Sequence, residues 1–348
     1  MILLIFTLFL FLSFLALFEI KDKNTEILLL MFCSLLLILF AGFRGGGVDR
    51  DYANYKEIFL NLTENSTYYI EPGFIIITKV VNFFSGTHLF LFFLFALLGV
   101  TIKSYAICKL SDYVFISLLI YFSNIYILNE LTQIRAGVAS GLLLLSLIPL
   151  QVKKNYQFFF IAFIAVLFHL TALVLFFVWF FDTDKINKKV WFVIIPLSYI
   201  VLFIGLSPVD IYKVIPIESI QAKVSTYIQL QESGDEKVNV ISTLVLLRLI
   251  VIFYLLKCID KIQLENKYAI ILTKIYIISL VALIVMSRTA AVALRFNEFF
   301  VVVEMFTLPL IIYTFPPKLR LIPRIIIVVF AAVLLFFHFR SKTLLIFE

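Results

Sequence analysis

Residues 41–74 read AGFRGGGVDRDYANYKEIFLNLTENSTYYIEPGF and separate two long apolar runs near the start of the chain. This polar interval contains three consecutive glycines and, after them, acidic, basic and tyrosine side chains only a few residues apart. Charges beside hydrocarbon are costly unless they pair or bind something. We therefore expect the interval to have a structural or chemical role at a membrane surface.

The composition predicts the fold class of the whole chain. Hydrophobic residues make up 63% of the 348 residues and charged residues 15%, which is far outside the range of soluble domains. Since a membrane span needs roughly 20 apolar residues, we predict an all-α polytopic membrane protein with about ten to twelve transmembrane or half-membrane helices. The apolar runs lack the alternation of barrel strands. A single integral membrane domain over 1–348 follows, with no room for a separate nucleotide-binding domain.

The predicted helices follow the apolar runs. Full spans are expected at 2–20, 27–43, 89–107, 112–129, 136–151, 189–206, 240–257, 268–287, 297–314 and 321–338. Segment 74–86 is too short to cross and should return as a half-helix. Segment 157–181 should either cross once or form a hairpin of two half-helices, with His169 at its apex and Thr171 capping the second half.

Short basic clusters between the apolar runs predict the orientation in the membrane. They are Lys21/Lys23, Lys103/Lys109, Lys153/Lys154, Lys185/Lys188/Lys189, Lys257/Lys261/Lys267 and Lys318/Arg320/Arg324. The positive-inside rule places them on the cytoplasmic face. Segments 129–136 and 287–296 then lie outside, together with two longer extracytoplasmic loops, 44–73 and 206–239. This scattering also explains the net charge of +7, so nucleic acid is not an expected partner.

The polar interval carries the first candidate site residues. Apolar or aromatic residues at 52, 55, 58, 59 and 62 have the spacing of an amphipathic helix on a membrane surface. Asp51 stands at the N-cap position of this helix, where it would accept hydrogen bonds from first-turn amides. It could equally orient or deprotonate a substrate hydroxyl. The other candidates in the interval are Arg44, Asp49, Tyr52, Tyr55 and Glu71.

Gln133 and Arg135 form the second group, at the mouth of a helix rich in small residues. An arginine at this place either snorkels to the interface or binds an anion. Because a guanidinium group matches phosphate oxygens bidentately, Arg135 is the first candidate for binding a lipid-linked diphosphate.

Later segments add a histidine and two arginines. His169 is the one histidine deep inside an apolar segment, and it is either a satisfied core residue or a catalyst. Arg288 and Arg295 are seven residues apart and would share a helix face, with Glu298 one turn further on. The two arginines would straddle a diphosphate, or Arg295 would pair with Glu298.

No cofactor or metal site is expected from the sequence. Cys33, Cys108 and Cys258 form no CxxC motif or Cys/His cluster. Asp49-Arg50-Asp51 spells DxD, but a three-residue match is a weak signal of metal binding.

These motifs, in this order, resemble the EpsG-like branch of the Wzy-type polymerases, which assemble bacterial O-antigen, capsule and exopolysaccharide. The motifs are FR…VDRDYANYKEIF at 43–59, EPGF at 71–74, LTQIRAGVASG at 131–141, LFHLTAL at 167–173 and RFNEFF at 295–300. The family often has Gly-Thr-Asp where this chain has Asp49-Arg50-Asp51. Asp51 is the favoured counterpart of the family's aspartate, because Tyr52 and Tyr55 follow it.

The resemblance implies a metal-independent glycosyltransferase of the bacterial inner membrane, with a fold similar to the multi-span (GT-C-like) enzymes that use lipid-linked sugars. Its site would face the extracytoplasmic side. Its substrate would be an undecaprenyl-diphosphate-linked oligosaccharide, whose growing chain passes to the non-reducing end of a new repeat unit. A flippase and a chain-length regulator would be pathway partners, and membrane lipid would surround the protein.

The resemblance also suggests roles for the candidate residues. Asp51 or His169 would take the proton of the acceptor hydroxyl. Arg135 and Arg288, with Arg44 or Arg295, would neutralise the departing diphosphate. Two alternatives stay open, an O-antigen ligase-like glycosyltransferase and a flippase or transporter of lipid-linked oligosaccharides.

Overall fold

A computed structural model of the chain describes residues 2–62, 70–206 and 238–341. Within these ranges the chain forms helices joined by short connections, and no β-strand occurs among them. Five helical segments are long and apolar enough to cross a membrane, and a bent pair of helices makes a sixth. The five are Lys23–Gly42, His88–Leu110, Val114–Thr132, Ile134–Gln151 and Pro317–Phe339. The predicted all-α polytopic membrane fold is confirmed.

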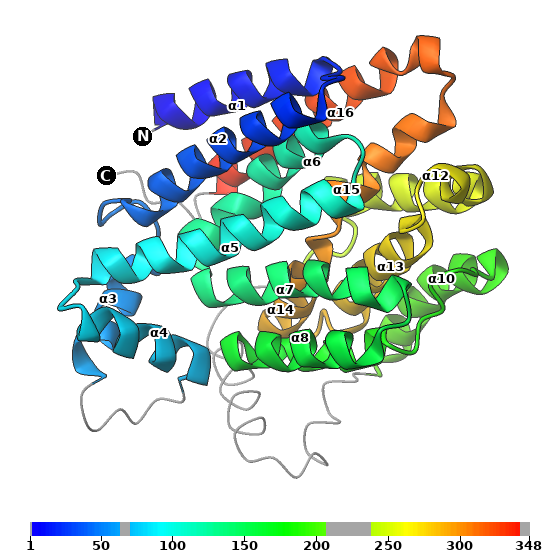
Figure 1. Cartoon of the computed structure of the whole chain (residues 1–348). Coiled ribbons are helices and arrows are strands. Elements are labelled where there is room, and N and C mark those ends of the chain that lie inside the picture. Colours follow the sequence, from blue (N-terminus) through cyan, green and yellow to red (C-terminus); the bar gives the residue numbers. More distant parts are fainter. Residues whose placement is uncertain (1, 63–69, 207–237, 342–348) are drawn as a thin grey trace. The chain divides into compact units, whose positions relative to one another are not determined.

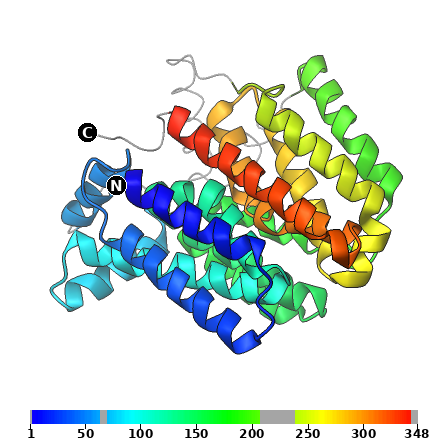
Figure 2. The ribbon, with the colours of Figure 1, turned by 90° about the horizontal axis from the view of Figure 1, so that it is seen from above.

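The helices fall into two compact units, residues 1–176 with 304–348, and residues 177–303. In the first unit, four helices pack in succession: α2 (Lys23–Gly42), α5 (His88–Leu110), α7 (Ile134–Gln151) and α8 (Asn155–Phe168) (Figure 1). Also in this unit, α1 (Ile2–Leu17) packs on α6 (Val114–Ile120) and α16 (Leu321–Ser341) (Figure 2). Since most of these helices bury one side against the bundle and leave apolar side chains such as Leu3 and Leu10 exposed on the other, the exposed sides suit lipid.

The second unit is built around α13 (Ala269–Val285). This helix contacts α10 (Lys188–Ile204), α12 (Thr243–Glu265) and α14 (Ala290–Val301). Every residue of α13 from 269 to 277 is buried. That burial makes α13 the centre of this unit.

The predicted span at 297–314 is wrong. The sequence placed its start at 297, after a segment 287–296 on the outer side, but helix α14 already starts at Ala290 and ends at Val301. The chain then bends by 41° into α15 (Glu304–Thr307) and a 3-10 turn, Pro309–Thr314. Polar residues within α14 hid its true start from the hydropathy pattern. One of them, Asn297, is buried, and its side-chain amide donates to the carbonyl of Ser279 (2.9 Å).

The two short segments behave much as predicted. Helix α4 (Pro72–Phe83) has twelve residues, too few to cross a membrane. Helix α8 ends at Phe168, and the expected break at His169 is confirmed. The capping prediction is wrong, because the Thr171 amide donates to Nδ1 of His169 (3.3 Å), so the histidine is the cap. The predicted outer loop 206–239 lies almost wholly outside the described residues.

Lys103 does not lie in a cytoplasmic basic cluster, so its pairing with Lys109 in the topology prediction is wrong. It is fully buried within α5, and its Nζ is 2.6 Å from Oε1 of Glu130. A lysine in an apolar run can indicate a helix end or a buried partner, and hydropathy alone does not distinguish them.

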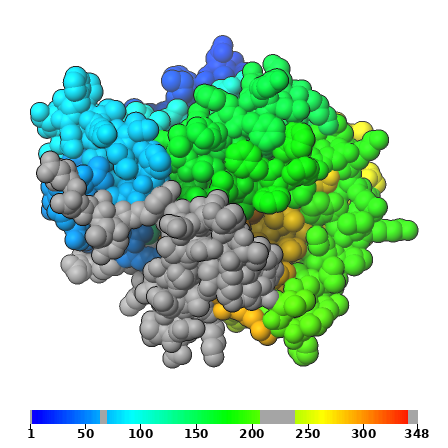
Figure 3. Space-filling view, turned by 90° about the horizontal axis from the view of Figure 1, so that it is seen from below, coloured from blue at the N-terminus to red at the C-terminus, as the bar shows by residue number. Residues whose placement is uncertain are grey.

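Helices α4 and α8 lie side by side on one face of the first unit (Figure 3). At their contact, a Cβ added to Gly73 would lie 2.9 Å from both the Leu167 carbonyl oxygen and a ring carbon of Phe168. The start of α4 is therefore held against the end of α8, directly before His169.

We expect Gly73→Ala to destabilise the protein by about 1–2 kcal/mol, because the backbone carbonyl cannot move aside and this overpacking outweighs the gain in helix propensity. The measurement is thermal unfolding in detergent followed by circular dichroism. Gly45→Ala is the matched control, since nothing lies within 4 Å of its added Cβ. A Gly73→Ala protein as stable as Gly45→Ala would contradict the expectation.

Candidate functional site

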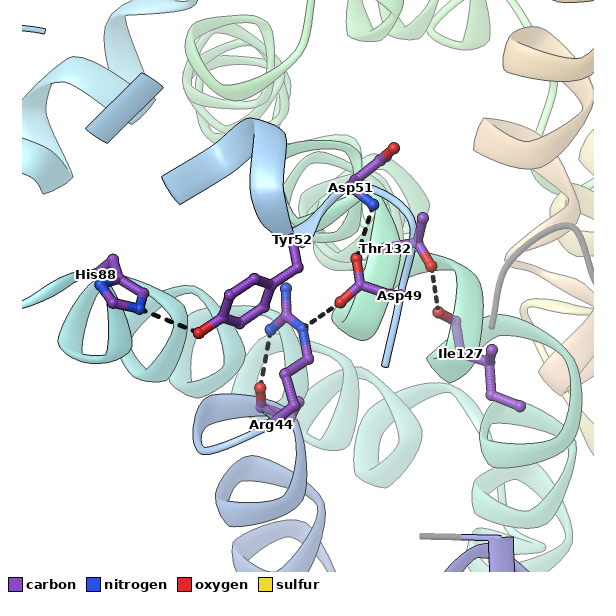
Figure 4. Close-up of polar contacts among 8 residues, drawn as sticks. Arg44, Asp49, Asp51, Tyr52, His88, Ile127 and Thr132 are labelled. Carbon is purple, nitrogen blue, oxygen red and sulfur yellow. Dashed lines mark hydrogen bonds and ion pairs between the residues drawn. The ribbon is translucent and has the colours of Figure 1, made fainter. Parts of the chain in front are cut away.

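The start of the polar interval is held by a buried ion pair between Arg44 and Asp49. Arg44 Nε donates to Asp49 Oδ2 (2.8 Å), and Nη1 donates to the carbonyl of Ala41 at the end of α2 (2.8 Å). Both charged side chains have 0% exposure. The other carboxylate oxygen of Asp49 accepts the amide N–H of Asp51 (3.0 Å) (Figure 4). This pair therefore fixes the loop that enters α3 (Tyr52–Asn61).

Asp51 occupies the N-cap position of α3, but its side chain makes no capping hydrogen bond, so that structural role is wrong. Its backbone is close to helical (φ −94°, ψ −6°) rather than extended, which turns the carboxylate away from the first-turn amides. The side chain is 28% exposed, lies 3.7 Å from Arg50 and points away from Asp49 (Figure 4).

The predicted amphipathic helix is confirmed as α3, with Tyr55 and Phe59 on its buried side. Tyr52, one turn before Tyr55, bonds through its hydroxyl to Nε2 of His88 (3.0 Å), and its ring packs on Phe92. Burial raises the pKa of the Tyr52 phenol above its ordinary value, and the Asp49 carboxylate raises it further against the opposing effect of Arg44. Tyr52 is therefore a neutral hydrogen-bonding group at physiological pH.

A second ion pair joins Glu71, the residue before α4, to Arg135 in the first turn of α7. The Arg135 guanidinium lies 5.5 Å from the ring centroid of Tyr55 and 5.9 Å from that of Phe74. Glu71 is 2% exposed, whereas 21% of the Arg135 side chain reaches the surface. Arg135 is thus easier for a ligand to reach than Arg44, whose side chain has 0% exposure.

Helix α3 therefore presents one tyrosine to each ion pair. The Arg44 guanidinium lies 6.0 Å from the Tyr52 ring, and Arg135 lies beside Tyr55. The structure thus brings together Arg44, Asp49, Tyr52, Tyr55, Glu71 and Arg135 as two aromatic-lined ion pairs. Sequence spacing predicted the members of this group but not which acid pairs with which arginine.

Gln133 is buried at the junction between a π-helical segment, η1 (Tyr121–Thr132), and α7. Its amide N–H donates to the Leu128 carbonyl (2.7 Å), and its own carbonyl accepts from the Gly137 amide (2.8 Å). The main chain of Gln133 therefore joins the two helices on either side of it.

His169 has an extended backbone (φ −156°, ψ 126°) directly after α8. Nδ1 accepts the amide proton of Thr171, so in the neutral ring the proton resides on Nε2. Through the Gly73 contact described above, the end of α8 lies beside the turn that carries Glu71.

The remaining candidates belong to the second unit. Arg288 lies in the turn before α14 and donates from Nη1 to the carbonyl of Gly205 (3.1 Å). Arg295 and Glu298 lie within α14. The predicted helix face shared by Arg288 and Arg295 is wrong, because the helix begins only at Ala290.

Three polar residues near the predicted site were missed by the sequence reasoning. They are His88, which bonds to Tyr52, and the buried pair Lys103 and Glu130. Glu130 directly precedes the LTQIRAGVASG motif at 131–141. An acidic residue in an apolar run is itself a signal of a functional or paired group. His88 carries no such signal, because it stands at a segment end.

The family comparison agrees with this arrangement of motifs. A sequence model described as the EpsG family matches residues 27–347, which is nearly the whole chain. No curated protein and no solved structure matches the chain. The chain is therefore an integral membrane protein of the EpsG family, a family of Wzy-like polymerases with a role in polysaccharide biosynthesis.

Proposed function

We propose that the protein is a glycosyltransferase that joins undecaprenyl-diphosphate-linked oligosaccharide repeat units on the outer face of the bacterial inner membrane. The hydroxyl at the non-reducing end of a new repeat attacks the anomeric carbon of the growing chain. The bond from that carbon to the diphosphate breaks, a new glycosidic bond forms, and the hydroxyl proton passes to a base. Membership of the EpsG family supports this class of reaction.

The observation that carries the proposal is the Glu71–Arg135 pair. Arg135 is held between a buried carboxylate and two aromatic rings, yet part of its side chain is exposed at the mouth of α7. An arginine fixed in this way can stabilise the negative charge that gathers on a leaving diphosphate without reorganising during the reaction. Arg44 is buried and bonded to Asp49 and to the Ala41 carbonyl, so it suits a structural role in holding the loop before α3.

Asp51 is the favoured base. Its carboxylate is partly exposed, and its backbone carbonyl accepts the amide of Tyr55, the residue that contacts Arg135. His169 uses Nδ1 to accept the Thr171 amide, so the neutral ring presents a proton donor at Nε2. His169 therefore suits a hydrogen-bonding role toward the substrate better than the role of base.

We expect Asp51→Asn to lower polymerisation about 10²- to 10⁴-fold, because the amide cannot take a proton. The measurement is the polysaccharide ladder on a gel, from cells whose chromosomal copy carries the substitution and whose protein level is confirmed. Collapse to a single-repeat band supports the polymerase. Loss of that band as well would favour flipping or ligation, and a normal ladder would exclude Asp51 as the base.

A further inference from the structure

Lys103 lies at the centre of a buried polar cluster that the proposed reaction does not use. Its ammonium group donates to Glu130 Oε1 (2.6 Å) and to the carbonyl oxygen of Gly137 (2.5 Å). The Tyr121 hydroxyl donates to the same glutamate oxygen (3.0 Å). Lys103, Glu130 and Tyr121 are buried to at least 99%.

The two acceptors of Lys103 stand on opposite sides of a break in the chain. Glu130 belongs to η1 and Gly137 to α7, and between them the backbone of Gln133 leaves the helical conformation (φ −96°, ψ 58°). Lys103 comes from a third helix, α5, and therefore holds the end of η1 and the first turn of α7 in a fixed relation. Arg135 lies in that first turn.

Lys103, Glu130 and the Gly137 carbonyl together form what we call the clamp. The packing around this clamp leaves little freedom for another arrangement of η1 and α7. A Cβ added to Gly137 would lie 2.5 Å from the carbonyl oxygen of Asn129, and one added to Gly99 would lie 3.0 Å from Cδ of Glu130. Because backbone atoms or a buried carboxylate occupy the space at both glycines, a small rotation of α7 would require several groups to move together.

Stability alone does not explain a charged pair at this place. Replacing a buried ion pair by neutral side chains of similar size is often neutral or stabilising, since the pair loses its hydration. A second connection across the break, from the Asn129 amide to Ser140 Oγ (2.9 Å), also supports the junction without Lys103. The particular contribution of Lys103 is to fix the direction of both sides of the break relative to a third helix, α5, which the Asn129–Ser140 bond does not contact.

We propose that Lys103 is a positioning residue of the transferase: by bonding Glu130 and the Gly137 carbonyl together, it sets the direction in which Arg135 meets the leaving diphosphate. This inference rests on the proposed function. Displacing a catalytic group by about 1 Å can cost roughly 10²-fold in rate, so a buried residue that never contacts substrate can control turnover.

The test compares four forms of the full-length protein in lipid nanodiscs: wild type, Lys103→Met/Glu130→Gln, Arg135→Lys, and the triple variant. The substrate is the lipid-linked repeat-unit fraction extracted from cells that lack this gene, and initial rates are measured against its concentration. We expect Lys103→Met/Glu130→Gln to unfold near the wild-type temperature, with kcat lowered about 10- to 100-fold and KM within about twofold.

The decisive comparison is the double-mutant cycle with Arg135→Lys. If Lys103 acts through Arg135, the clamp change should lower kcat by less than about threefold in the Arg135→Lys background. An equal loss in both backgrounds, or a folded clamp variant with wild-type kcat, would overturn the inference. Wild-type kcat for Arg135→Lys and also for Arg135→Ala would instead overturn the proposed function, so the two failures are distinguishable.

Two further variants complete the design. Ser104→Ala, the next residue on α5, removes a buried hydrogen bond to Ser34 (2.7 Å) that does not involve α7, and it should keep the wild-type kcat. If Lys103→Met/Glu130→Gln does not fold, Lys103→Gln/Glu130→Gln replaces it. The two glutamines can bond to each other, but the shorter side chain at 103 does not reach the Gly137 carbonyl, which keeps only its bond from Ser140 Oγ (2.9 Å). The same loss of kcat is therefore expected, and its absence overturns the inference.

Discussion

Arg135→Ala is expected to lower the rate of repeat-unit polymerisation by about 10²- to 10³-fold, the loss typical of removing one preorganised donor from a charge-stabilising site. The guanidinium is the group that the structure holds between Glu71, Tyr55 and Phe74 with part of it exposed. The measurement is the initial rate with extracted lipid-linked repeat units, together with the length distribution of the cell-surface polysaccharide.

The Arg135→Ala protein needs a control for stability, because the substitution leaves the Glu71 carboxylate buried without this cation. Arg135→Ala/Glu71→Gln removes that uncompensated charge and should recover the unfolding temperature but not the activity. Lys79→Ala removes a positive charge from an exposed position on α4 and should polymerise like wild type. Recovery of activity in the double variant would show that Arg135 acts only through folding.

Arg44→Met is expected to reduce stability, whereas Arg135→Ala is expected to reduce activity. The free energy of unfolding should fall by about 3–5 kcal/mol, because the substitution leaves the Asp49 carboxylate buried without its arginine partner. Both side chains of this pair have 0% exposure, so solvent cannot compensate for the missing charge. The loop between α2 and α3 should loosen as a result. The measurement is thermal and denaturant unfolding in detergent micelles, followed by circular dichroism.

Arg44→Met/Asp49→Asn is the matched control for this stability effect. It removes both charges, so it should recover most of the lost stability, while the asparagine oxygen can still accept the Asp51 amide. If Arg44→Met alone is as stable as wild type, the Arg44–Asp49 pair does not hold the loop. If Arg44→Met is stable but inactive, Arg44 acts on substrate and the division of roles between the two arginines is wrong.

The site illustrates which features can be read from spacing. Apolar and aromatic residues that recur every three to four positions predicted the buried side of α3. The single polar interruption at His169 predicted the break after α8. The sequence could not predict which charged residues form ion pairs, because Glu71 and Arg135 are 64 residues apart and Lys103 and Glu130 are 27 residues apart. A charged residue at the edge of an apolar run looks the same whether it faces water or a partner.

What the sequence alone determined is the class of molecule, since the hydropathy of long apolar runs permits only helices that satisfy their own backbone hydrogen bonds in lipid. It also determined the order of motifs that places the chain in the EpsG family. Only the tertiary structure decided that Asp49 seals Arg44, that Glu71 orients Arg135, and that Lys103 joins η1 to α7. Those choices depend on which helices pack together, because a buried charge is stable only beside a partner that packing supplies.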